Sequence, residues 1–163
     1  MRYRITITYN KKNMKTVFLT LFDAKGNTAR KGLWCIGFCL LSTGLFAQSS
    51  AVHHFTLGQQ KRNQGNYAKA VTHFTRALEL DASLVQAHEL RGYSYACLRK
   101  YRQALKDYNK ALTMGYENAM LYLNRGWAYY SLGEKDEACI NWEKSNLMGY
   151  KGVEKVLKKY CGF

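Results

Sequence analysis

The residues of this chain that could do chemistry are its histidines, serines and cysteines. The histidines are His53, His54, His73 and His88. A zinc site needs three or four converging ligands, usually with cysteine or carboxylate help, and these histidines do not form such a set. A nucleophile could be sought at Ser94, Cys97 or Cys139, but the sequence has no nucleophile elbow, phosphate-binding loop or HExxH motif. We therefore expect no enzyme, no catalytic residue, no metal site and no cofactor.

The charge of the chain is strongly basic but unevenly distributed. The 163 residues hold 25 Lys and Arg against 11 Asp and Glu, a net charge of +14. Half of that net charge lies in residues 1–47, which carry eight basic side chains and one acidic one. In the rest of the chain acids stand between the bases, the usual pattern of a solvated surface. We therefore do not expect nucleic acid as a partner.

Residues 1–47 have the features of a secretory signal peptide. Residues 33–46 are uncharged and mostly apolar, Arg30 and Lys31 precede them, and Ala47 follows. The apolar run is shorter than the roughly 20 residues that span a bilayer. These features predict cleavage after Ala47 and export, to the periplasm or cell envelope of a bacterium. The alternative is an uncleaved signal that anchors the protein, its only association with a membrane.

The beginning of this segment is longer than a signal peptide requires. A start at Met14 instead of Met1 would shorten it, so an over-extended N-terminus is an alternative interpretation of residues 1–13. Residues 2–10 alternate in polarity like a strand. A strand needs a partner strand to be stable, and we expect this one to have none.

The remainder of the chain repeats with a period of 34 residues, seen in three columns of equivalent positions. The columns are Gly58, Gly92 and Gly126; Ala70, Ala104 and Ala138; and Phe74, Tyr108 and Trp142. Two helices approach closely only where both lack bulk, and an aromatic ring fills the space beside such a contact. The columns therefore predict pairs of packed helices near residues 52–64 and 68–80, 86–98 and 102–114, and 120–132 and 136–147. Apolar positions on one face of residues 153–161 predict a final helix that caps the stack.

These residues resemble the tetratricopeptide-repeat (TPR) family. Leu57-Gly58, Tyr67, Ala70, Phe74 and Ala77 stand as in the family motif, and the period has the family's length. The family's usual proline near each repeat end is replaced by Ala82, Tyr116 and Tyr150. The resemblance implies an all-α domain over residues 48–163, a right-handed solenoid of three hairpins (51–84, 85–118 and 119–152) with cap helix 153–161.

The resemblance also implies a scaffold or adaptor that binds a peptide or partner protein on the concave wall made by the first helix of each pair. It implies no small-molecule substrate. The candidate binding residues are Phe55, Gln59, Arg62, Tyr93, Asn124, Trp127 and Tyr130. Exposed aromatic and arginine side chains are the usual anchors of such sites. The alternative is a structural subunit that docks laterally on a larger envelope complex.

One TPR subclass binds C-terminal carboxylates through Lys, Asn and Arg side chains on this wall. The matching positions here hold Phe55, Gln59, Leu90, Met120 and Asn124. Since the cations are missing, we do not expect binding of this kind.

The hairpin geometry predicts two pairs of residues that face each other. Around a turn near Arg99, Arg91 lies opposite Asp107, and we expect an ion pair. Helix 136–147 and the cap rise at about 1.5 Å per residue around a turn near Tyr150, which places Cys139 opposite Cys161. In an oxidising compartment these two cysteines are expected to form a disulfide, with Cys97 left as a free thiol.

Overall fold

The computed structural model describes residues 4–9, 17–22 and 34–162, which fall into two compact units, Met1–Phe46 and Ala47–Phe163. The basic flank Arg30–Lys31 and the alternative start Met14 lie outside the described residues. In the first unit, strand β1 (Arg4–Tyr9) pairs antiparallel with β2 (Val17–Phe22), so that Arg4 faces Phe22 and Ile7 faces Leu19. The expectation of a strand without a partner was therefore wrong. The partner is a short run of apolar residues and threonine, a composition that favours strands.

Helix α1 (Trp34–Asn63) is a single helix of 30 residues. It includes residues 34–46 of the apolar run, the predicted cleavage point at Ala47 and the first helix of the repeat array. The prediction that this first helix starts at residue 52 was therefore wrong. Among the described residues, no helix has the length and apolar content to cross a membrane.

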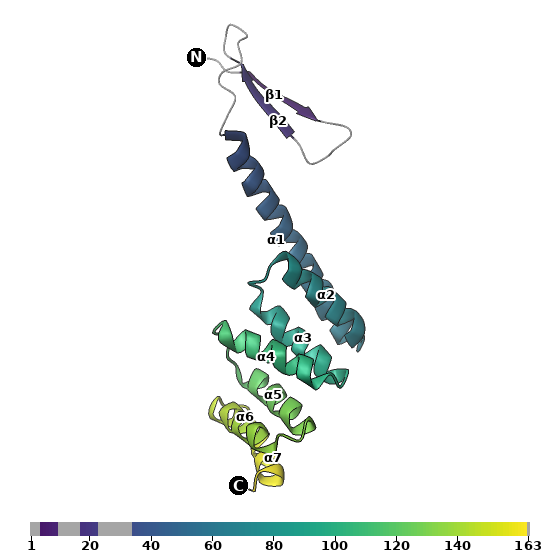
Figure 1. Ribbon diagram of the computed structural model, residues 1–163, viewed down its shortest axis with the longest axis vertical. Coiled ribbons are helices and arrows are strands. Elements are labelled where there is room, and N and C mark those ends of the chain that lie inside the picture. The colour runs from purple at the N-terminus through teal and green to yellow at the C-terminus, as the bar shows by residue number, and fades with distance from the viewer. Residues whose placement is uncertain (1–3, 10–16, 23–33, 163) are drawn as a thin grey trace. The chain divides into compact units, whose positions relative to one another are not determined.

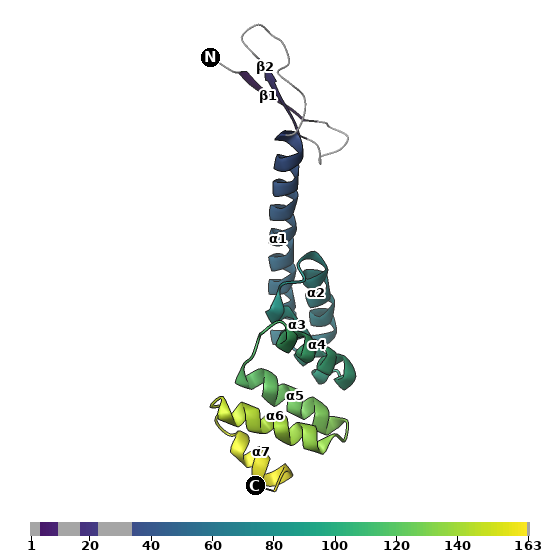
Figure 2. The same cartoon turned by 60° about the vertical axis from the view of Figure 1, so that its left-hand side comes forward.

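The second unit is built from helical hairpins. Its further helices are α2 (Tyr67–Leu80), α3 (Val85–Cys97), α4 (Tyr101–Thr113), α5 (Ala119–Ser131), α6 (Lys135–Leu147) and α7 (Val153–Tyr160). Their ends agree with the predicted ranges to within about one residue. The hairpins α3–α4 and α5–α6 stack in chain order, and α7 packs against α6 (Figures 1 and 2). The repeat domain is therefore the predicted all-helical solenoid with a capping helix.

The glycine and aromatic columns meet inside each hairpin. A Cβ atom built on Gly58 would come within 2.6 Å of the Phe74 ring, one on Gly92 within 2.8 Å of Tyr108, and one on Gly126 within 2.5 Å of Trp142. All three aromatic residues are fully buried. Each ring therefore lies directly over a helix backbone that carries no side chain, which is why both columns repeat together.

Candidate functional site

The concave wall of the repeat domain carries a pocket of about 360 Å³. It is lined by Arg62, Asn63, Tyr67, Glu89, Leu90, Tyr93, Met120 and Asn124. With the exception of Tyr67, these residues come from the first helix of each hairpin, α1, α3 and α5. The pocket brings together three of the predicted binding residues, Arg62, Tyr93 and Asn124.

A nearly buried carboxylate, that of Glu89, belongs to this pocket. Glu89 is 9% exposed. Tyr116 Oη donates a hydrogen bond of 2.9 Å to Glu89 Oε2, and Asn118 Nδ2 donates one of 3.2 Å to Oε1. Burial and this bond to Glu89 raise the pKa of Tyr116, which keeps its hydroxyl protonated as the donor. The loop before α5 thus fixes the orientation of an acidic group on the wall.

The pocket also contains aromatic and basic side chains. The rings of Tyr67 and Tyr93 meet edge to face with centroids 6.2 Å apart. The neighbouring Cys97 side chain raises the pKa of Tyr93. The Arg62 guanidinium donates from Nη2 and Nε to Asn63 Oδ1, at 2.9 and 3.3 Å. The pocket therefore offers a cation, a carboxylate and aromatic surface.

Trp127 and Tyr130 lie in a second feature, which we call the aromatic platform: Trp127, Tyr130, Trp142 and Tyr160. The six ring-centroid distances between these four residues run from 4.9 Å to 6.0 Å. Trp142 is fully buried, whereas Trp127 and Tyr130 are 36% and 37% exposed. Both predicted residues thus present an accessible ring backed by buried aromatic packing.

Phe55 and Gln59 lie outside the pocket lining. Phe55 is half-buried and packs on Phe74 with ring centroids 5.9 Å apart, as part of the first hairpin's core. Gln59 is also half-buried. The structure therefore assigns Phe55 a packing contact and brings neither residue to the pocket.

Two family models described as tetratricopeptide repeat match the chain, one over residues 92–144 and the other over residues 54–83. Together they cover just over half of the sequence. The chain is a tetratricopeptide-repeat protein. No curated protein sequence matches it.

Solved structures similar to this TPR protein are themselves TPR domains. The first TPR of Spaghetti (RPAP3), bound to the HSP90 peptide SRMEEVD, is 22% identical with a TM-score of 0.66, covering 71% of this chain and 93% of that one. The Arabidopsis OM64 TPR domain is 22% identical with a TM-score of 0.67, covering 71% and 98%. YrrB, described as a TPR protein with an unusual peptide-binding site, is 23% identical with a TM-score of 0.57, covering 61% and 51%. At these identities the likeness concerns the fold.

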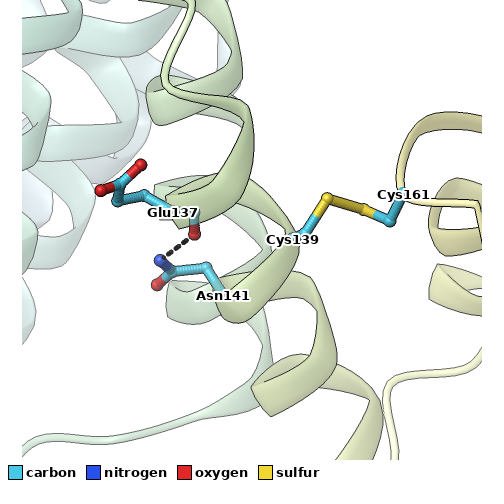
Figure 3. The surroundings of a disulfide bond; sticks show 4 residues. All are labelled: Glu137, Cys139, Asn141 and Cys161. Carbon is cyan, nitrogen blue, oxygen red and sulfur yellow. Dashed lines mark hydrogen bonds between the residues drawn. A yellow bond between two sulfur atoms is a disulfide. The ribbon is translucent and has the colours of Figure 1, made fainter.

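The last TPR hairpin is joined covalently to the cap. Cys139 on α6 and Cys161 just after α7 form a disulfide, the pairing expected from the sequence, with Cα atoms 5.8 Å apart (Figure 3). On the neighbouring turn of α6, Asn141 Nδ2 donates to the Glu137 carbonyl at 2.7 Å. Cys97 is a free, exposed cysteine. The bond fixes α7 on the end of the repeat stack.

The middle hairpin contains the predicted ion pair. Arg91 Nη2 and Nε donate to Asp107 Oδ1 and Oδ2 at 2.7 and 2.8 Å, which confirms the pairing. Two further contacts were not predicted: His88 Nδ1 lies 3.2 Å from Asp107 Oδ1, and Arg91 Nη1 donates to Thr75 Oγ1 on α2 at 3.1 Å. Burial alone would raise the pKa of Asp107, but the hydrogen bonds from Arg91 and His88 outweigh it and the pKa is lowered. The network therefore stabilises the charged carboxylate and links the first two hairpins.

We expect Asp107→Asn to lower the free energy of unfolding by about 1–2 kcal/mol at neutral pH, because the amide keeps one acceptor but loses the charge. Since the folded-state pKa of Asp107 lies below the unfolded one, its stabilisation is complete above the unfolded value, near 3.8, and is lost as the pH falls through the folded value. Urea unfolding at neutral and acidic pH measures this. A difference between wild type and variant that does not shrink in acid would contradict it.

His54 and His73 are explained by packing between the two helices of the first hairpin. His54 and His73 stack with centroids 5.7 Å apart and Nδ1 atoms 3.4 Å apart, at positions equivalent to His88 and Asp107. Nearby Lys61 and Lys69 add to burial and to His54 in lowering the pKa of His73. Among the side chains that the structure describes, no three His, Cys, Asp or Glu are placed to share a metal ion.

The hydrogen bonds that orient Glu89 were not predicted from the sequence. Tyr116 stands where the family usually has proline, and that departure is the one signal that could have pointed to it. A tyrosine hydroxyl reaches across 27 residues to Glu89, a distance along the chain that no local pattern encodes.

Proposed function

We propose that this TPR protein is an exported adaptor that holds an extended peptide or a segment of a partner protein on its concave wall. The observation that carries this proposal is the pocket, which draws its lining from all three first helices. The exposed rings of Trp127 and Tyr130 add anchors of the kind that dominate binding energy at protein interfaces.

Relatives of the fold support peptide binding as the use of such a wall. The Spaghetti domain was solved with the peptide SRMEEVD, and the second TPR domain of human RPAP3 with the HSP70 peptide SGPTIEEVD. In the present chain the wall positions Leu90 and Met120 are apolar and line the pocket. We therefore propose a peptide that is not recognised through a terminal carboxylate.

Export is supported by the apolar run 33–46 behind Arg30 and Lys31, and by a disulfide, which persists in oxidising compartments. We expect the mature protein to begin at Gln48 outside the bacterial cytoplasm. N-terminal sequencing of the fractionated protein measures this. An intact Met1 or Met14 in the membrane fraction would instead indicate an uncleaved anchor.

Lateral docking on a larger complex is the second candidate function. Ile140 and Leu147 lie two helical turns apart on α6 and are 53% and 87% exposed. Residues at that spacing share one side of a helix. This apolar side belongs to a second helix of a hairpin, whereas the pocket is made mainly by first helices.

Affinity capture with matched variants separates the two functions. We expect Trp127→Ala to weaken capture of the partner by about 1–3 kcal/mol, as for an interface anchor, and Ile140→Ala to leave capture unchanged. The measurement is quantitative pull-down from the source cell's envelope fraction, followed by titration with the identified partner.

Circular dichroism supplies the control, because Trp127 also contacts the buried Trp142. Helicity should be largely retained in Trp127→Ala. Should this variant unfold, Trp127 belongs to the core and its place on the binding wall is wrong. Loss of capture with Ile140→Ala alone would favour lateral docking.

A further inference from the structure

We propose that the pocket accepts a basic side chain, a lysine or arginine of the bound peptide, on the carboxylate of Glu89. This inference rests on the proposed function, since it names the chemistry of the ligand held on the same wall. It follows from the burial of Glu89, from the kind of groups around its carboxylate, and from the surfaces that line the space in front of it.

Glu89 carries a charge that its surroundings only partly compensate. The residue is 9% exposed, and its two hydrogen-bond donors, Tyr116 and Asn118, are neutral. Among the described residues, the acids held in ion pairs are Glu79 and Asp107, so Glu89 has no cation within 4.0 Å. A buried carboxylate without a cation is costly unless a charge is supplied. A ligand cation would supply it.

Asp107 gives an internal comparison on the same hairpin. It too is buried, but two basic side chains, Arg91 and His88, reach its oxygens. The chain thus supplies a cation of its own, Arg91, to a buried acid that faces the helix pair. Glu89 faces the pocket, and there the neutralising cation would come from a ligand.

The lining of the pocket suits the stem of a long basic side chain. Tyr67 and Tyr93 offer aromatic surface, and Met120 and Leu90 offer apolar surface. Lysine and arginine bury their methylene groups on apolar surfaces, and their charged groups are attracted by aromatic faces. The volume of about 360 Å³ is sufficient for one such side chain.

Arg62 limits the choice to a single basic residue. It lines the same pocket, where its guanidinium is held by Asn63. Like charges at short range are unfavourable, so a run of consecutive lysines or arginines would be repelled. The preferred segment has one basic side chain for Glu89 and neutral or acidic neighbours.

The test uses the ¹⁵N-labelled full chain and three nonapeptides of Ser, Gly and Ala that differ at the central residue, which is arginine, citrulline or glutamate. Citrulline keeps the shape of arginine without its charge. We expect the arginine peptide to bind at least about ten-fold more tightly than the citrulline peptide, the usual gain of a charge-assisted hydrogen bond. Amide shifts should concentrate at Glu89, Tyr93 and Asn124.

Glu89→Gln is the decisive variant and Glu137→Gln its matched control, because Glu137 is an exposed acid on α6. Glu89→Gln should abolish the difference between the arginine and citrulline peptides, whereas Glu137→Gln should keep it. Arg62→Met should tighten binding of the arginine peptide, since it removes a competing cation. Thermal melting establishes whether each variant is folded. If Glu89→Gln does not fold, the comparison of the arginine and citrulline peptides on the wild type tests the inference alone.

Equal binding of the arginine and citrulline peptides, a preference for the glutamate peptide, or no shifts with any peptide at millimolar concentration would each overturn the inference. None of these results would overturn the proposed function, provided that partner capture still depends on Trp127. If partner capture did not depend on Trp127 but the arginine peptide still bound more tightly than the citrulline peptide, the adaptor role would be contradicted and the inference about Glu89 would be retained.

Discussion

Replacing Trp142 by alanine should lower the free energy of unfolding of the repeat domain by about 3–5 kcal/mol, the usual cost of removing a large buried aromatic side chain. Trp142 is fully buried, lies directly over Gly126 and contacts the rings of Trp127, Tyr130 and Tyr160. The indole Nε1 has no hydrogen-bond partner among the described residues, so the loss is one of packing. Urea unfolding followed by far-ultraviolet circular dichroism measures it.

The control for this prediction is Trp142→Phe, because Phe74 occupies the equivalent position over Gly58 in the first hairpin. A phenylalanine keeps a ring over the glycine, and the loss should be clearly smaller than for alanine. If both variants lose the same free energy, contact between ring and glycine is not what holds the hairpin together. If Trp142→Ala lowered the free energy of unfolding by less than about 1 kcal/mol, the neighbouring side chains would have filled the space left by the indole ring.

The double variant Cys139→Ala/Cys161→Ala should lose about 3 kcal/mol of unfolding free energy. The two cysteines are 22 residues apart, and a loop of this length gives that value in the chain-entropy account of disulfides. Adding a reductant to the wild type should produce the same loss and should leave the variant unchanged. Chemical unfolding with and without reductant measures both effects.

Cys97→Ser serves as the control, since Cys97 is exposed and free, and it should unfold like the wild type. Mass spectrometry of the non-reduced, alkylated protein provides an independent check. It should find the Cys139 and Cys161 peptides linked and Cys97 alkylated. Alkylation of Cys139 and Cys161 as well as Cys97 would refute the bond.

The repeat domain could be predicted closely because its determinants are local and repeated. The glycine that admits a ring and the ring that covers it lie 16 residues apart in every copy, as in Gly58 and Phe74. The same hairpin register places Arg91 beside Asp107. Three copies of one pattern define the helix ends, and the structure reproduces them except at the start of α1, which begins at Trp34 and not at residue 52.

The parts of the structure that the sequence did not predict depend on contacts specific to one place. The pairing of β1 with β2 falls outside the repeat, where no second copy exists for comparison. Phe55 lies on the same helix as wall residues, but its position on the helix directs its ring towards Phe74. The first helices of the hairpins could be placed on the wall, yet the orientation of the Glu89 carboxylate comes from hydrogen bonds donated by Tyr116 and Asn118.

The covalent link at the end of the stack has a consequence for how the domain opens. In a solenoid each unit is held by its neighbours alone, so local opening proceeds from the ends. The disulfide between Cys139 and Cys161 restrains one end, and beside it lies the aromatic platform with Trp127. Amide hydrogens of α5 and α6 should therefore exchange with solvent more slowly than those of α2. A ligand that reaches from the aromatic platform to Arg62 would therefore contact helices that open rarely at one end and helices that open more often at the other.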